Sequence, residues 1–266
     1  MIISVINHTR GEIRDEGLQA VIRAINRQIT EDFAPYWGLN AELRLEGRFG
    51  RASAKSASDM RGDAVLYLCG AVPKSVDGLV GVHESTYRGI PYGFVFTELS
   101  GKLDEEWSTT LSHEVLELIA DPEVNLVVMG PHPARRGKNV FHWYEMCDAV
   151  QNESYKIDGV AVSNFVLPLY FTGGEERGGR NDFLGRAHQG KTLKSFGVNP
   201  GGYIGFYDPD TGGDDTFPPD DPVAAKRMQI KGEAKAARRL IRYRRFFAPR
   251  VTSAPAARRR PPTARG

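Results

Sequence analysis

Ser112-His113-Glu114-Val115-Leu116-Glu117 is the stretch around which this 266-residue chain is best interpreted. In a helix, His113 and Glu117 lie four residues apart on one face, with Glu114 beside them. An imidazole, a ligand carboxylate and a second carboxylate that can act as a general base form the minimal set for a metal-activated water. The stretch differs from the His-Glu-x-x-His zinc helix at one position, where Glu117 still offers an oxygen donor. It therefore predicts a metal-dependent hydrolase.

The helix that carries this motif has a defined end. Asp121-Pro122 follows it, and a proline both lacks an amide hydrogen and disfavours the helical conformation of the residue before it. On the other side, residues 98–110 indicate a strand end, a turn and a helix start. A motif of this spacing also arises by chance in ordinary helices, because Glu is common there. The context favours the metal site over that alternative.

The first half of the chain predicts strands with helices between them. Residues 17–37 place apolar side chains at spacings of three and four, which indicates an amphipathic helix. The segment at 89–97 alternates apolar residues directly before the motif helix, and it is a candidate edge strand beside a substrate cleft. Extended segments are expected at residues 2–7, 41–45, 63–70, 79–83 and 89–97.

A metal held by His113 and Glu117 alone would have too few protein ligands, since catalytic zinc usually has three and a water. Glu145 and Asp148 are the nearest later acids, and they follow an aromatic, partly buried segment. A carboxylate left without a partner in such a setting is costly. We therefore expect one of the two to complete the site, and the alternative is a pair of loop acids that accept from backbone amides.

Two imidazoles compete for the same place. His142 belongs to the aromatic segment and stays an alternative ligand. His132 stands between two prolines in what the sequence indicates is a surface loop. Tyr203, which follows Gly201-Gly202, is a candidate to approach the oxyanion, and a core or loop tyrosine is the alternative.

Several segments together resemble a zincin-like metallopeptidase family of bacteria and phages. They are the H-E-x-x-E helix ending in Asp-Pro, the aromatic-Glu-x-Cys-Asp segment at 144–148, and residues 162–168. Residues 28–38 and 201–203 are similar as well, so the resemblance runs from about residue 1 to about residue 207. A weaker similarity, limited to the H-E-x-x-E helix and the Glu-x-x-Asp segment, extends to the exordium-like phosphate-induced proteins of plants.

The resemblance implies an α+β fold of the zincin, metzincin-type kind. Such a fold has a mixed sheet, an active-site helix behind an edge strand, and a smaller C-terminal half that returns toward the cleft. It carries over His113 and Glu117 as metal ligands and Glu114 as the general base. Glu145 and Asp148 follow as the two candidates for the third ligand.

The chain departs from the H-E-x-x-H-x-x-G-x-x-H metalloproteases at three positions. Glu117 replaces the second His, Ala120 the Gly, and Glu123 the third His, so their mechanism transfers only by analogy. The extra negative charge of Glu117 weakens the Lewis acidity of zinc. Slower turnover or a preference for a harder ion would follow, so zinc is the expected cofactor and manganese is the alternative.

The net charge of +2 hides a strong asymmetry along the chain. Residues 222–266 contain 14 Lys and Arg against one acid, Glu233, which leaves −11 for residues 1–221. We expect a zincin-like catalytic domain at 1–221, with halves at about 1–122 and 123–221, and a basic helix with a disordered Arg/Pro/Ala-rich tail at 222–266. The tail is a candidate anchor for nucleic acid or an anionic surface. A solvated extension, or one that docks on the acidic body, is the alternative.

Composition narrows the class of protein. Hydrophobic residues make up 41% of the chain, enough for a core, and no stretch approaches the roughly 20 apolar residues that span a bilayer. The N-terminus has neither a basic leader nor a cleavage site, so no signal peptide is expected. Cys69 and Cys147 are too few for a disulfide scaffold and too far apart for a Cys-x-x-Cys site. A cytoplasmic location is expected, with association to a phage virion or assembly as the alternative.

The sequence as a whole predicts a metal-dependent peptidase. Glu114 would take a proton from the attacking water and pass it to the leaving amine of a peptide or protein substrate. One alternative is a catalytically inactive zincin-like module that binds a peptide or glycan. Another is a structural-metal protein of a phage or bacterial assembly with a basic tail that binds nucleic acid.

Overall fold

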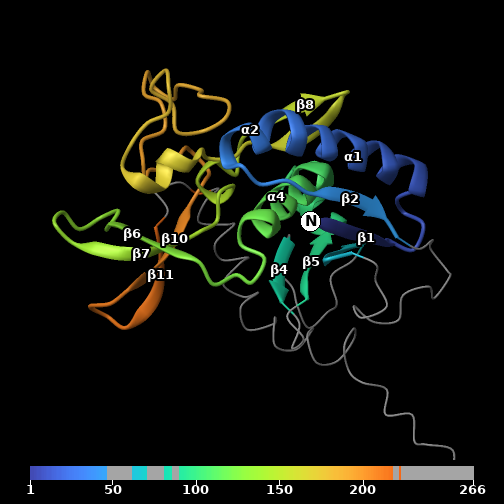
Figure 1. The fold of residues 1–266 in the computed structure, drawn as a ribbon, viewed down its shortest axis with the longest axis horizontal. Coiled ribbons are helices and arrows are strands. Elements are labelled where there is room, and N and C mark those ends of the chain that lie inside the picture. The colour runs from blue at the N-terminus through green and yellow to red at the C-terminus, as the bar shows by residue number, and fades with distance from the viewer. Residues whose placement is uncertain (47–61, 71–80, 86–89, 218–221, 223–266) are drawn as a thin grey trace, which may run out of the picture.

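The computed structural model describes residues 1–46, 62–70, 81–85, 90–217 and 222 (Figure 1). The basic helix and tail expected beyond Pro222 lie outside the described residues, as do residues 79–80 of one expected strand. The fold that follows is mixed, with parallel and antiparallel strands and few helices, and it is compatible with the predicted α+β class.

A five-stranded mixed sheet is the centre of the N-terminal part. Its strands occur where the sequence predicts extended segments, and β-branched and aromatic residues are frequent in β1, β3 and β5. The order is β2-β1-β3-β5-β4, in which β4 alone runs antiparallel to its neighbour. The bounds are β1 (Ile2–His8), β2 (Glu42–Leu45), β3 (Ala64–Cys69), β4 (Gly81–Ser85) and β5 (Pro91–Phe96).

The strand before the motif helix is not the edge strand, so that sequence prediction was wrong. β5 lies between β3 and β4, and all six of its residues are buried. Its two faces are both apolar, with Tyr92 and Phe94 on one and Val95 on the other, and a strand covered on both faces belongs inside a sheet. The edge next to it is β4.

One long helical segment follows β1. It begins as α1 (Asp15–Arg27), continues as the π-helical turn η1 (Gln28–Phe33) and ends as α2 (Ala34–Trp37). Gly38 ends it in the left-handed conformation, with φ of 66°, which glycine adopts without steric cost. The predicted helix at 17–37 is confirmed, whereas its π-helical turn was not anticipated.

The motif lies on the longest single α-helix of the described residues. A short helix that the sequence did not predict, α3 (Thr97–Lys102), follows β5, and α4 (Trp107–Ala120) comes next. α4 ends directly before Asp121-Pro122, as predicted. No helix among the described residues is both long enough and apolar enough to cross a membrane.

Helices α1 and α4 cover the same face of the sheet (Figure 1). Alternate residues of β1 and β3, such as Val5 and Leu66, share that face because they are paired in register. They join one apolar core with Ile25 of α1 and Val115 of α4. The motif helix α4 therefore has the five-stranded sheet on one side.

The C-terminal part forms a second, antiparallel sheet in the order β11-β10-β7-β6, and a separate hairpin of β8 and β9. The hairpin packs against α4 on the side opposite to the large sheet (Figure 1). The bounds are β6 (Val127–Pro131), β7 (Asn139–Trp143), η3 (Asp148–Val150), β8 (Ser154–Ile157), β9 (Val160–Ser163), η4 (Pro168–Thr172), β10 (Ile204–Asp208) and β11 (Gly213–Phe217).

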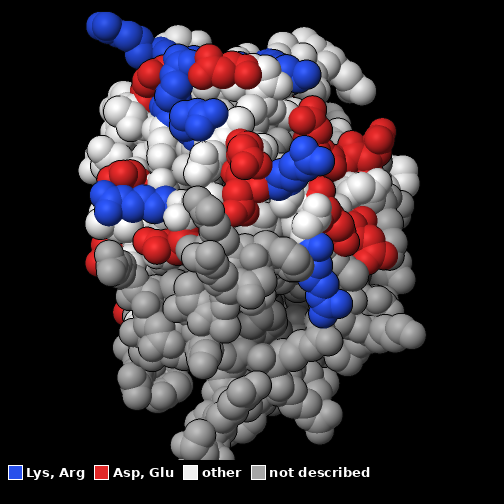
Figure 2. Space-filling model, turned by 90° about the vertical axis from the view of Figure 1, so that its right-hand side faces the viewer, with Lys and Arg blue, Asp and Glu red and all other residues white. Residues whose placement is uncertain are grey.

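Charges of both signs mix on the surface of the described part. Figure 2 shows one face on which acidic and basic side chains lie beside one another. Among the described residues, Arg27 pairs directly with Glu31 and Asp158. Exposed pairs of this kind contribute little to stability, about 0–1 kcal/mol each.

Candidate metal centre

Helix α4 carries its polar residues into the interior. Every residue from Ser108 to Ala120 is buried, including His113, Glu114 and Glu117. The helix packs against β5 and β4 on one side and against β9 on the other, so no face is left for solvent. Three ionisable side chains in one buried turn need partners, because an isolated buried charge is very costly.

His113 lacks the hydrogen bond that a buried imidazole nitrogen normally makes. Its Nε2 lies 3.2 Å from Glu117 Oε2 and 3.3 Å from Asp148 Oδ1. Neither contact is a hydrogen bond, so Nε2 has no hydrogen-bond partner in the described structure. The nitrogen without a hydrogen bond thus faces two carboxylate oxygens, which is the arrangement expected around a cation.

The Glu117 carboxylate connects α4 to the segment after β7. While its Oε2 faces His113, its Oε1 accepts a hydrogen bond of 3.1 Å from the backbone amide of Cys147. Glu117 is only 2% exposed. The amide fixes the orientation of the carboxylate and keeps one oxygen directed toward the imidazole.

Asp148 is held in place from the C-terminal half. The Tyr203 hydroxyl donates to Asp148 Oδ1 over 2.5 Å, and the Tyr203 amide donates to the Asp148 carbonyl over 3.1 Å. This close approach requires a glycine before Tyr203, because a Cβ on Gly202 would lie 2.3 Å from the Ala149 carbonyl oxygen. The C-terminal half therefore reaches the site through the 201–203 segment.

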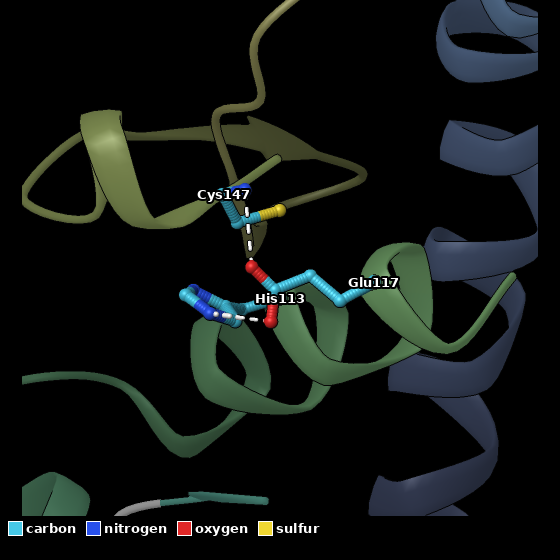
Figure 3. A group of neighbouring side chains, drawn as sticks. All are labelled: His113, Glu117 and Cys147. Carbon is cyan, nitrogen blue, oxygen red and sulfur yellow. Dashed lines mark hydrogen bonds and ion pairs between the residues drawn. The ribbon is translucent and has the colours of Figure 1, made fainter. Parts of the chain in front are cut away.

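Cys147 completes the cluster. One ligand atom each from His113, Glu117 and Cys147 lies within 4.8 Å of the other two, and all three residues are buried (Figure 3). In Figure 3 the imidazole and the carboxylate leave neighbouring turns of α4, and Cys147 approaches from the segment above. Nitrogen, oxygen and sulfur are the three donor types that proteins use for zinc. The residues present fit a metal ion.

The electrostatics of the cluster favour positive charge at its centre. Burial by itself lowers the pKa of His113, but the carboxylates of Glu117 and Asp148 outweigh it and hold that pKa well above 6.5. Burial, reinforced by the same two carboxylates, raises the pKa of the Cys147 thiol well above its usual 9.0. Without a cation, the surroundings therefore favour an imidazolium and a protonated thiol.

The structure brings together three of the predicted site residues and connects a fourth. His113, Glu117 and Asp148 converge, and Tyr203 contacts Asp148 rather than standing apart in a loop. Glu114 is 4% exposed, and its charge contributes to the raised pKa of the Cys147 thiol. Each of these residues therefore belongs to one buried neighbourhood.

The other predicted candidates lie differently. Glu145 follows β7 in a partly exposed position and is not a member of the three-donor group. His142 directs Nε2 to the Pro131 carbonyl at 2.9 Å and packs on Phe196, and burial lowers its pKa. The ring of His132 accepts backbone amides of its own loop at Nδ1. The geometry thus favours Asp148 over the two histidines as a further oxygen donor.

A buried polar network that was not predicted from the sequence connects α4 to η1 and β9. Ser112 Oγ donates to Gln28 Oε1 (2.6 Å), and Gln28 Nε2 donates to the Ser163 carbonyl (2.8 Å). The Ser163 amide donates in turn to Ser112 Oγ (3.0 Å). The sequence feature that could have indicated this network is Gln28, because the helical period places this polar residue on the same buried face as Ile25 and Ile29.

Comparisons of the chain with protein-family models, with curated proteins and with solved structures give no match. The site is therefore interpreted from its own geometry.

Proposed function

We propose that this chain is a zincin-like, metal-dependent peptidase. The observation that carries the proposal is the buried Nε2 of His113, which faces the Glu117 and Asp148 carboxylates without a hydrogen bond to either. A cation bound to this nitrogen would satisfy it, and the two carboxylates would compensate the positive charge. His113 and Glu117 would hold it, with Asp148 as the further oxygen donor.

The arrangement of elements supports the zincin-like interpretation. A mixed sheet has one antiparallel edge strand, β4, and the motif helix α4 packs behind it. A smaller C-terminal part returns to the site through Tyr203. These are the features that the resemblance of the H-E-x-x-E segment implies.

The chemistry divides between the ion and the chain. A divalent ion bound here would supply Lewis acidity, which polarises a substrate carbonyl and lowers the pKa of water. Glu114 is the proton carrier, because it is adjacent to His113 but outside the group of donors. Its carboxylate takes a proton from the attacking water and returns it to the leaving amine.

Tyr203 and the backbone of the 147–148 segment position the donors. The Tyr203 hydroxyl holds Asp148, and the Cys147 amide holds Glu117. Such outer contacts fix the direction of ligand oxygens and tune the centre. Tyr203 is therefore a positioning residue, in place of the oxyanion role expected from the sequence.

A second candidate is a structural-metal protein, and the burial of the donors favours it. The side chains of His113, Glu117 and Asp148 are 5%, 3% and 2% exposed. Structural metal sites are closed, whereas catalytic sites keep one position open to water or substrate. The two candidates predict the same metal binding and opposite results in a cleavage assay.

Replacing the proposed proton carrier tests the peptidase directly. Glu114→Gln should retain near-stoichiometric metal, measured by elemental analysis, and should lower cleavage of a peptide library by about 10²- to 10⁴-fold. The matched control is Glu123→Gln, an exposed acid beyond the end of α4 that should leave both properties unchanged.

Two outcomes would contradict the proposal. Cleavage by Glu114→Gln at the wild-type rate would remove Glu114 from the reaction. Metal retention without any cleavage by the wild-type protein would favour the structural centre or an inactive binding module.

A further inference from the structure

We infer that Cys147 is a thiolate ligand of the centre and that the centre consequently selects a thiophilic divalent ion, zinc in preference to manganese. The inference rests on one part of the proposed function, namely that the cluster binds a metal. It adds Cys147 as a ligand and zinc as the preferred ion. The sequence alone placed neither, since manganese stayed open and Cys147 had no role.

The first support is position. The backbone amide of Cys147 binds Glu117, and the next residue, Asp148, faces His113. The segment that positions Asp148 therefore positions the thiol of Cys147 as well. Its ligand atom lies within 4.8 Å of those of His113 and Glu117 (Figure 3). Zinc–nitrogen and zinc–sulfur bonds are about 2.0–2.3 Å long, so two donors of one ion lie at most about 4.6 Å apart, and a small side-chain movement brings atoms within 4.8 Å of one another to that range.

The second support is the unsatisfied imidazole. His113 is 4% exposed, and its Nε2 has no hydrogen-bond partner in the described structure. The nitrogen faces one oxygen of the Glu117 carboxylate, and the other oxygen of that carboxylate lies toward Cys147 (Figure 3). The missing hydrogen bond is independent of the cysteine, and it requires a cation or a proton at that nitrogen.

A disulfide or a nucleophilic role for Cys147 fits the surroundings poorly. The residue is fully buried and carries no disulfide. A nucleophilic cysteine needs an electropositive and accessible setting, whereas Cys147 is beside the carboxylates of Glu117 and Asp148. Binding of a divalent ion reverses this environment: a metal–sulfur bond forms, and the thiol proton leaves to the buffer.

The donor set then determines the metal. A thiolate is a soft ligand that favours zinc, whereas carboxylates and water without sulfur suit manganese. Together with His113, Glu117 and Asp148, the thiolate would provide four protein donors of three types. That set matches a closed zinc site in number and kind, so in a peptidase the attacking water would occupy a fifth position.

X-ray absorption on the zinc-loaded, full-length wild-type protein tests the inference without any substitution. We expect a sulfur shell at about 2.3 Å in addition to nitrogen and oxygen at about 2.0–2.2 Å. Zinc bound through nitrogen and oxygen alone would overturn the inference.

Cobalt titration of variants provides the second measurement. Wild type and Cys69→Ser, the matched control for the other buried cysteine, should both develop a sulfur-to-cobalt charge-transfer band in the near ultraviolet. Cys147→Ser should bind cobalt without that band, and its preference for zinc over manganese should fall by at least about tenfold, the loss that even an outer contact can produce. A band that persists in Cys147→Ser contradicts the assignment.

The results separate this inference from the proposed function. A sulfur shell in a protein that cleaves no peptide supports the ligand and contradicts the peptidase. Peptide cleavage by a centre without a sulfur ligand supports the peptidase and contradicts the Cys147 ligand. A protein that binds neither zinc nor cobalt overturns both.

Discussion

His113 is the side chain on which the negative charges of this site converge. Two carboxylate oxygens lie 3.2 and 3.3 Å from its Nε2, and the surroundings exclude water. Like charges so close together in a buried setting repel strongly unless positive charge stands between them. An imidazolium supplies one positive charge, and a divalent ion supplies two, so the ion compensates both acids more completely.

Tyr203 should control how firmly Asp148 is oriented. Tyr203→Phe removes the hydroxyl that donates to Asp148 Oδ1 while keeping the buried ring. We expect zinc affinity, measured by competition with a chromophoric chelator, to fall by about 10- to 100-fold with little loss of folding. Tyr207→Phe, on an exposed tyrosine of β10, is the control. Equal affinities of the two variants would mean that Tyr203 serves packing alone.

Asp182 should give folding stability an unusual pH dependence. It is fully buried, and burial chiefly raises its pKa above the ordinary 3.8. The folded state therefore binds more protons than the unfolded state just above pH 3.8, and stability falls as pH rises through the folded pKa. Asp182→Asn has no such group to deprotonate. The unfolding free energy of the variant minus that of wild type should therefore increase as pH rises from about 3.8 through the folded pKa.

Urea unfolding at a series of pH values measures this difference. Asp214→Asn, on an exposed acid of β11, should show no such trend relative to wild type. A constant difference between Asp182→Asn and wild type from acidic to neutral pH would contradict the expected protonation of Asp182.

At the scale of elements, the π-helical turn η1 matters because it directs Gln28 to α4. Gln28→Ala leaves the Ser112 hydroxyl and the Ser163 carbonyl without their shared partner in the interior. We expect a loss of about 2–4 kcal/mol in the free energy of urea unfolding, since each unsatisfied buried group costs about 1–3 kcal/mol. Gln19→Ala on the exposed side of α1 should change it little. Equal losses would show that the network is not important for stability.

Elements whose signals are local could be predicted from the sequence. The apolar runs of β3 and β5 predicted strands, and Asp121-Pro122 predicted the end of α4. The position of β5 inside the sheet could not be predicted, because it depends on pairing with β4. For the same reason Cys147 was missed: its proximity to His113 exists only after two distant segments pack.

For the whole molecule, the site is where the two parts of the fold meet. α4 belongs to the part built on the five-stranded sheet, whereas Cys147 and Asp148 follow β7 of the antiparallel sheet. The approach is close enough that Gly202 admits no Cβ beside Ala149. A metal bound by donors from both parts would link them directly.

Metal removal should therefore lower the stability of the entire fold. A ligand that binds only the folded state stabilises it by about 2.7 kcal/mol at a free concentration 100 times its Kd. We expect thermal unfolding with excess zinc to occur at a higher temperature than unfolding in a chelator. His113→Gln should lose this zinc-dependent increase, because it removes the only imidazole in the three-donor group of the described residues. His132→Gln, in the loop after β6, should keep the increase. If zinc stabilises His113→Gln as much as wild type, the ion binds elsewhere and the two parts are joined by packing alone.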